Sequence, residues 1–168
     1  MEINKKIRYK EEHEDRFDIS MPTVEDPTLV VCPKCSKMAK VFPSNEKPKI
    51  GYSMRVACTN CGYVKEKTDN VRRYYWHDED PTDGYFKYPL WLKNSCCGHP
   101  LWVFNRRHLE FLEKFVSAEL REREQKDKYG WSNGSLMSRL PKWIKSKKNR
   151  KKILECLAKL RVMGGLEE

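Results

Sequence analysis

Four cysteines in two closely spaced pairs are the residues of this 168-residue chain whose chemistry is easiest to name. They stand in Cys32-Pro-Lys-Cys35 and Cys58-Thr-Asn-Cys61, with 22 residues between the two pairs. A two-residue gap lets a tight turn direct both thiolates at one ion, and two such turns supply the four ligands of a tetrahedral site. We therefore expect one structural Zn²⁺ ion, with an iron–sulfur or single-iron centre as the alternative. A site filled by four thiolates has no open position for a substrate.

A second group of possible ligands or nucleophiles follows later in the chain. Cys96-Cys97-Gly98-His99 could supply a second metal site, with His77 or His108 as further ligands. The alternatives are a turn with one cysteine packed inward as a small apolar residue, or a reactive thiol. Adjacent cysteines on a strand point to opposite faces, which argues against one ion held by both. Because no orienting partner or oxyanion device accompanies Cys97, we expect no catalytic site and no enzyme activity.

Positive charge is concentrated near the end of the sequence. The formal net charge is +10, and ten Lys or Arg residues with a single acid lie between Arg139 and Arg161. Such a segment attracts phosphate backbones through charge and counterion release, and an aromatic side chain among the cations can stack on a base. The alternatives are a solvated helix face or an anionic membrane surface. The candidate nucleic-acid-binding residues are Arg139, Lys142, Trp143, Lys145, Lys147, Lys148, Arg150, Lys151 and Lys152, and the cysteine module adds Lys34, Lys37, Lys40 and Arg55.

The cysteine module resembles the zinc ribbons of general transcription factors and polymerase subunits. The resemblance rests on Cys32-Pro-Lys-Cys35 and on Val56-Ala-Cys-Thr-Asn-Cys-Gly62; it covers about residues 29–68 and implies a fold rather than a task. Two later stretches resemble a bacterial zinc-ribbon family of unknown function, which implies a bacterial source. They are Leu90-Trp-Leu-Lys-Asn-Ser-Cys-Cys-Gly-His-Pro-Leu-Trp102 and Arg139-Leu-Pro-Lys-Trp-Ile144.

Composition restricts the class of protein. Hydrophobic residues make up 39% and charged residues 35%, but 11% aromatic residues predict a modest packed core rather than a disordered chain. No apolar run is long enough to cross a bilayer, and residues 1–10 carry no secretory signal pattern. We therefore expect a cytoplasmic protein with reduced cysteines and no membrane partner.

The residues that could do chemistry are divided among four expected segments. These are a charged arm or loosely docked strand over 1–28, a zinc ribbon over 29–68, an aromatic β-hairpin with a long helix over 69–130, and a basic helical segment over 131–168. In the ribbon we expect strands at 38–42, at 50–57 and directly after Gly62. In the hairpin we expect strands at 86–93 and 100–104.

Two helices follow from apolar periodicity. Leu109, Leu112, Val116 and Leu120 form one helical stripe behind a possible Asn105 N-cap, which predicts a long helix over 106–129. A last helix is expected to start near Ser146 or Asn149 and to end near Met163. The expected fold is α+β: an N-terminal zinc ribbon with additional antiparallel strands, then the long helix and a short basic C-terminal helix.

Three functions compete on these features. The one we expect is non-enzymatic binding of nucleic acid, DNA or RNA, through the basic segment. The alternative is a protein-interaction adaptor that docks on a larger complex, with the 106–129 helix as a partner surface. The third is an enzyme that uses Cys97 or a second metal ion.

Overall fold

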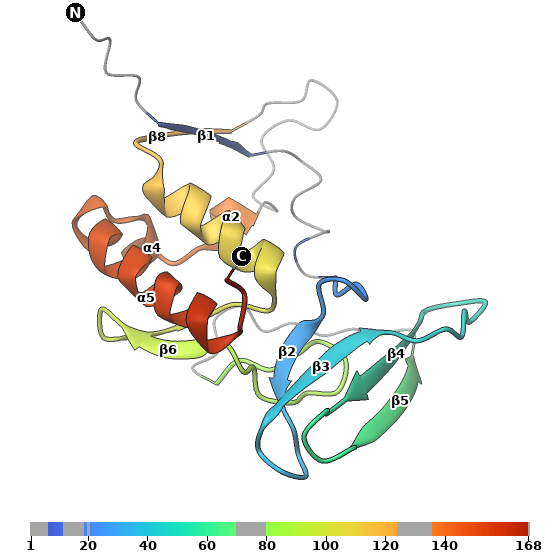
Figure 1. The fold of residues 1–168 in the computed structure, drawn as a ribbon. Coiled ribbons are helices and arrows are strands. Elements are labelled where there is room, and N and C mark those ends of the chain that lie inside the picture. Colours follow the sequence, from blue (N-terminus) through green and yellow to red (C-terminus); the bar gives the residue numbers. More distant parts are fainter. Residues whose placement is uncertain (1–6, 12–18, 20, 70–79, 124–135, 168) are drawn as a thin grey trace, which may run out of the picture.

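The protein folds into a four-stranded sheet on one side and a helical half on the other (Figure 1). The computed structural model describes residues 7–11, 19, 21–69, 80–123 and 136–167. The strands are β1 (Arg8–Glu11), β2 (Thr28–Val31), β3 (Met38–Pro43), β4 (Tyr52–Ala57), β5 (Val64–Asp69), β6 (Lys93–Cys96), β7 (His99–Trp102) and β8 (Leu120–Arg123). The helices are α2 (Arg106–Ser117), α3 (Leu136–Arg139), α4 (Lys142–Lys145) and α5 (Arg150–Met163), with a 3₁₀ turn η1 (Lys147–Asn149) before α5.

The four-stranded sheet is antiparallel and has the order β2-β3-β4-β5. Successive side chains of each strand point to opposite faces of the sheet, and one of these faces carries most of the apolar side chains of β3 and β4. Val41 of β3 lies opposite Val56 of β4, and both are fully buried. Tyr85 and Leu90, from the segment that precedes β6, complete this sheet core.

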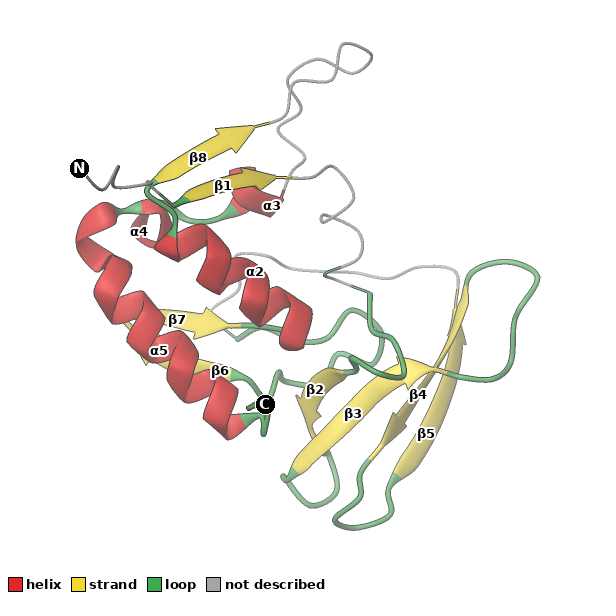
Figure 2. Cartoon of the chain, turned by 45° about the horizontal axis from the view of Figure 1, so that its top comes forward, coloured by secondary structure: helices red, strands yellow, loops and turns green. Residues whose placement is uncertain are grey.

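The helical half is built on α2 and α5, which pack against each other, while the β6–β7 hairpin packs against α5 (Figure 2). The apolar stripe of α2 is buried and includes Leu109, Leu112 and Phe115. The facing side of α5 contributes Ile153, Cys156, Leu157 and Leu160 to the same helical core. The apolar periodicity of both helices is thus used for packing.

Strand β2 belongs to both cores. Leu29 packs into the helical core, whereas the next residue, Val30, packs into the sheet core. The edge of β2 that faces away from β3 forms hydrogen bonds with the helical half. Leu29 N donates to Phe104 O at 2.9 Å, and Trp91 N donates to Leu29 O at 3.0 Å. The two halves therefore share backbone hydrogen bonds as well as side-chain contacts.

The expectation of a mixed α and β fold with antiparallel sheets and a helix near the C-terminus is confirmed. Strands β3, β4 and β5 match the three strands expected at 38–42, at 50–57 and directly after Gly62, and α5 matches the expected last helix. Within the 1–28 segment, residues 8–11 form a docked strand, the second of the two alternatives for that segment.

The expected helix over 106–129 is wrong beyond Ser117. The backbone of Ala118 is extended, and Leu120–Arg123 forms β8, which pairs in parallel with β1 in the register Arg8↔Leu120. Glu119 N donates to Ile7 O at 2.8 Å, and Arg150 Nη2 donates to Ala118 O at 2.8 Å. Pairing with a distant strand therefore replaces the helix there, while 124–129 lie outside the described residues.

The expected strand over 86–93 is also wrong, since β6 starts only at Lys93. The carboxylate of Asp83 accepts the backbone N–H groups of Tyr85, Phe86 and Tyr88 at 2.7–2.8 Å. These bonds hold the segment in a compact turn, with Lys87 at a positive φ of 64°. A carboxylate that satisfies three amides removes the donors that a strand would use.

Candidate metal centre and basic surface

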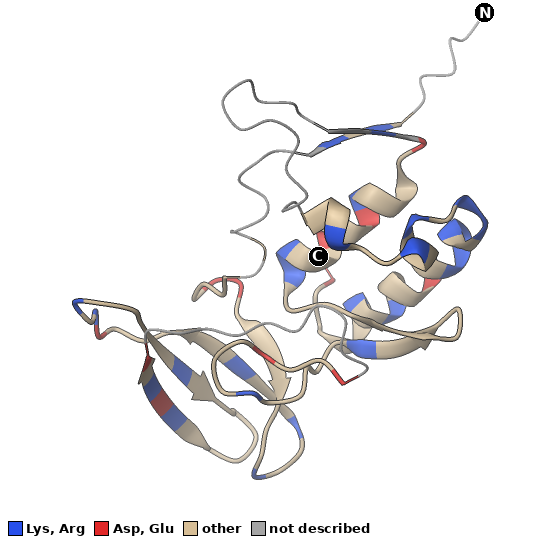
Figure 3. Ribbon diagram, turned by 180° about the vertical axis from the view of Figure 1, so that it is seen from behind, with Lys and Arg blue, Asp and Glu red and all other residues tan. Residues whose placement is uncertain are grey.

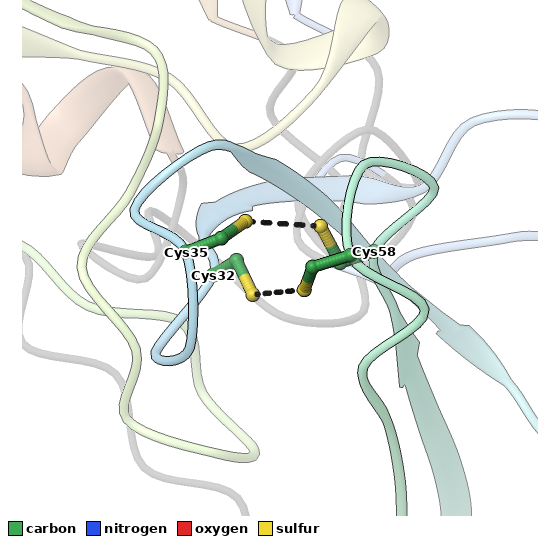
Figure 4. Close-up of side chains that lie close together, drawn as sticks. Cys32, Cys35 and Cys58 are labelled. Carbon is green, nitrogen blue, oxygen red and sulfur yellow. Dashed lines mark hydrogen bonds between the residues drawn. The ribbon is translucent and has the colours of Figure 1, made fainter.

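The four cysteines of the two spaced pairs meet at one end of the sheet. The Sγ atoms of Cys32 and Cys61 lie 3.7 Å apart, those of Cys35 and Cys58 lie 3.6 Å apart, and all four ligand atoms lie within 4.8 Å of one another. Figure 4 shows the sulfurs of Cys32, Cys35 and Cys58 directed toward a common point. A tetrahedron with metal–sulfur bonds of about 2.3 Å has edges of about 3.8 Å. The four thiols therefore fit one metal ion.

The two cysteine turns have the same backbone structure. In the first turn Cys32 N donates to Lys37 O at 2.7 Å, and in the second Cys58 N donates to Tyr63 O at 2.8 Å. Ser36 and Gly62 occupy equivalent positions, and both have positive φ values, 59° and 71°. Each turn reverses the chain within two residues of its second cysteine, which directs both thiols of a pair to the same side.

The environment moves the pKa values of two thiols in opposite directions. The backbone N–H of Lys37 stabilises the Cys35 thiolate and lowers its pKa to about 6. The N–H of Tyr63 acts on Cys61 in the same sense, but burial and the neighbouring thiols outweigh it and raise the pKa of Cys61 to about 12. Four neighbouring thiolates would repel one another, so crowded thiols do not all lose their protons unless a cation takes the place of the protons. A bound metal ion would do so.

Cys96 and Cys97 form a different kind of site. Their Sγ atoms lie 3.9 Å apart, and Cys96 is buried between the hairpin and α5, with its Sγ 3.8 Å from Lys152 O. Burial, together with Cys156 and Cys97, raises the pKa of Cys96. The sequence offers no sign of the contact with Cys156, because nothing in the spacing of Cys156 links it to Cys96. A buried thiol with a raised pKa is a poor nucleophile.

The histidines named as further ligands do not join these thiols. His99 stacks on Trp143, with ring centroids 5.0 Å apart. His108 is buried, its Nδ1 accepts the N–H of Phe104 at 3.2 Å, and burial lowers its pKa to about 3. His77 lies outside the described residues. Within the described part of the chain, the only group of three or more Cys, His, Asp or Glu side chains close enough to share an ion is Cys32, Cys35, Cys58 and Cys61.

The candidate nucleic-acid-binding residues lie on α3, α4, η1 and the first turn of α5, where basic residues gather in Figure 3. Lys145 and Arg150 are turned toward the protein: Lys145 Nζ donates to Ser138 O at 3.0 Å, and Arg150 bonds to Ala118 O. Trp143 is half-buried. The six exposed cations, which we call the basic surface, are Arg139, Lys142, Lys147, Lys148, Lys151 and Lys152.

The cations of the ribbon region do not extend the basic surface. Lys34, Lys37 and Lys40 are exposed, but they belong to the cysteine turn and the sheet, away from α4 and η1 (Figure 3). The guanidinium of Arg55 pairs with Glu66 across β4 and β5. These cations are therefore separate from the group around η1, where the ion pair within the described residues is that of Lys152 with Glu155.

Comparisons with protein-family models, with curated proteins and with solved structures find no match to this chain. In the part of the chain that the structure describes, no helix is both long and apolar enough to span a membrane. The function must therefore be argued from the metal centre and the basic surface.

Proposed function

We propose that this protein binds nucleic acid through its basic surface and that a zinc ion at the four cysteines holds the sheet half in shape. The observation that carries the proposal is the charge around the start of α5. Lys147 and Lys148 precede the helix, Arg150, Lys151 and Lys152 form its first turn, and this turn holds no acid.

This arrangement works against helix stability. The N-terminus of a helix carries a partial positive charge, so acids stabilise the first turn and each cation there costs about 0.3–1 kcal/mol. Packing does not require the charges either, since Lys147, Lys148, Lys151 and Lys152 are exposed. A bound polyanion would offset both the repulsion among the lysines and the unfavourable dipole.

The ion that we propose for this site is zinc rather than iron. Four cysteines joined by matched turns, with two of the cysteines buried in the sheet core, are typical of a closed structural centre. Metal analysis of the purified protein tests this directly. One zinc per chain supports the proposal, whereas iron with visible charge-transfer absorption contradicts it.

The binding proposal is tested by salt-dependent titration of labelled oligonucleotides. The double variant Lys151→Gln with Lys152→Gln should lose about tenfold in affinity, and the slope of log K against log salt should fall by about 2. The matched control, Lys40→Gln with Lys65→Gln, removes the same charge from exposed positions on the sheet and should change affinity much less. Equal losses in the two variants, or no binding at low salt, would contradict the proposal.

The adaptor alternative finds no support on α2. Its apolar residues are all turned inward, so that this helix presents no exposed apolar patch to a partner. For an enzyme that uses Cys97, the described histidines are poorly placed as a base, since His99 is stacked on Trp143 and His108 is enclosed among aromatic rings.

A further inference from the structure

An aromatic pair adjoins the basic surface. His99, at the start of β7, stacks on Trp143 of α4 with ring planes 12° apart. Trp143 is half-buried and packs against the helical core, whereas His99 is exposed. The tryptophan thus supports the imidazole from the protein side, and the accessible aromatic side chain of the pair is that of His99.

Contacts on both sides of this pair place it beside the first turn of α5. Cys96 is the partner of His99 across the hairpin, and Cys96 Sγ lies 3.8 Å from Lys152 O. On the other side of the pair, Asn149 Nδ2 donates to Trp143 O at 2.9 Å. The hairpin tip and α4 are therefore both joined to the helix start where the lysines are densest.

An open hollow of about 520 Å³ runs along the same hairpin. Its lining includes the exposed His99 and the polar side chains of Lys93, Asn94 and Ser95, and Gly98 and Pro100 complete it. Side-chain and backbone groups of this kind can exchange hydrogen bonds with base edges and sugars. A strand that contacts His99 would thus find polar partners next to it.

We propose that the His99–Trp143 pair stacks on an unpaired base, so that the basic surface takes single-stranded nucleic acid in preference to a duplex. This inference rests on the proposed function and adds the class of ligand. In a duplex, neighbouring base pairs cover the faces of the bases, whereas an unpaired base offers its face to an aromatic ring. Lysines alone recognise the backbone of either form.

The test measures fluorescence anisotropy of a labelled oligothymidine strand, an oligouridine strand and a DNA duplex of equal length, from about 50 to about 200 mM salt. The native protein should bind a single strand more tightly than the duplex. His99→Ala should weaken single-strand binding about fivefold and leave duplex binding and the salt slope unchanged. His99→Phe, which keeps an aromatic face, should retain the single-strand affinity. All variants are compared at equal zinc content and equal helical circular dichroism.

The outcomes separate this inference from the proposed function. Salt-dependent binding that is equally tight for duplex and single strand overturns the inference and leaves the proposed function standing. The inference is also overturned, and the proposed function again left standing, if His99→Ala weakens the binding of single strand and duplex equally, or weakens the binding of neither. Absence of binding to every probe at low salt overturns both. Loss of single-strand preference in His99→Ala, with recovery in His99→Phe, supports both.

Discussion

The two cores of the protein differ in the number and the kind of their buried residues. Among the described residues, the helical core has twenty buried members, most of them large aliphatic or aromatic side chains, whereas the sheet core has ten. Two of those ten, Cys32 and Cys58, belong to the candidate metal centre. Strand β5 on the sheet edge contributes almost nothing, because most of its residues are exposed. A half with so little apolar surface to bury needs another source of stability, and four thiols around one ion can supply it.

Removal of the metal should have the largest effect and should separate the two halves. A structural zinc ion contributes about 10–16 kcal/mol of apparent binding energy in small zinc domains. We expect the variant Cys58→Ser, or treatment with a strong chelator, to abolish amide protection in β3, β4 and β5. Amides of α2 and α5 should keep most of their protection in hydrogen exchange measured by mass spectrometry.

Loss of protection in both halves to the same extent would show that they unfold as one unit. The shared strand β2 would be the structural reason, since it belongs to both cores.

Truncation in the helical core provides the reverse test. Phe115 of α2 is 1% exposed and stacks against Phe111. Phe115→Ala should lower the free energy of unfolding by about 3–5 kcal/mol, because it removes apolar burial and leaves a cavity. Val162→Ala, at a position 60% exposed, is the control and should change stability by less than about 0.5 kcal/mol. Urea unfolding gives both values, and the metal content of Phe115→Ala should remain at one ion per chain.

Acid should destabilise the helical half through His108. Burial lowers the pKa of His108 to about 3 in the folded protein, from an ordinary value of 6.5. The neutral form is therefore favoured on folding, so this contribution to stability is fully present above pH 6.5 and is lost as the pH falls toward 3. Between pH 6.5 and about pH 5 the loss should amount to about 2 kcal/mol.

The variant His108→Asn isolates this effect, because an amide oxygen can accept the Phe104 N–H without titrating at these values. Its unfolding free energy should fall less than that of the native protein over the same interval. Parallel curves for the two proteins would show that another group is responsible. Protonation of the metal thiols is common to both proteins and does not enter the comparison.

The smallest effects should distinguish the two cysteine turns. Ser36 adopts a left-handed conformation that disfavours residues with a Cβ atom, so Ser36→Gly should stabilise the first turn by up to about 1 kcal/mol. At the equivalent place in the second turn, a Cβ added to Gly62 would meet nothing within 4 Å. Gly62→Ala should therefore cost about 1 kcal/mol of backbone strain and no more. Thermal unfolding of the metal-loaded variants measures both changes, and shifts of the same sign would contradict the equivalence of the turns.

Local patterns were sufficient for the metal centre and for α5. The spacing within each cysteine pair determines how a turn directs its thiols, and the periodicity of Ile153, Leu157 and Leu160 marks the buried side of α5. Both depend on residues close together in the sequence. The sequence therefore predicted which four cysteines meet, while the binding of a metal ion and its identity stay predictions.

Distant contacts account for what the sequence could not reveal. Residues 118–129 are rich in helix formers, yet β8 forms because β1 supplies a partner more than a hundred residues away. A local sign was present in Ser117, whose Oγ bonds to Glu113 O at 2.7 Å and competes for the carbonyls of the last helical turn. The meeting of His99 with Trp143 likewise joins a hairpin to a later helix, and spacing alone contains no information about it.

The parallel pairing of β1 with β8 also orders events during synthesis on the ribosome. Both cysteine turns belong to the first 63 residues, so the four cysteines can meet while the rest of the chain is still being made. Residues 8–11 must wait until 120–123 have left the exit tunnel, and Tyr9 then covers Phe111 and Phe115. Pairing of such widely separated segments is slow because a long loop must be closed. The earliest strand in the sequence is thus among the last to find its place.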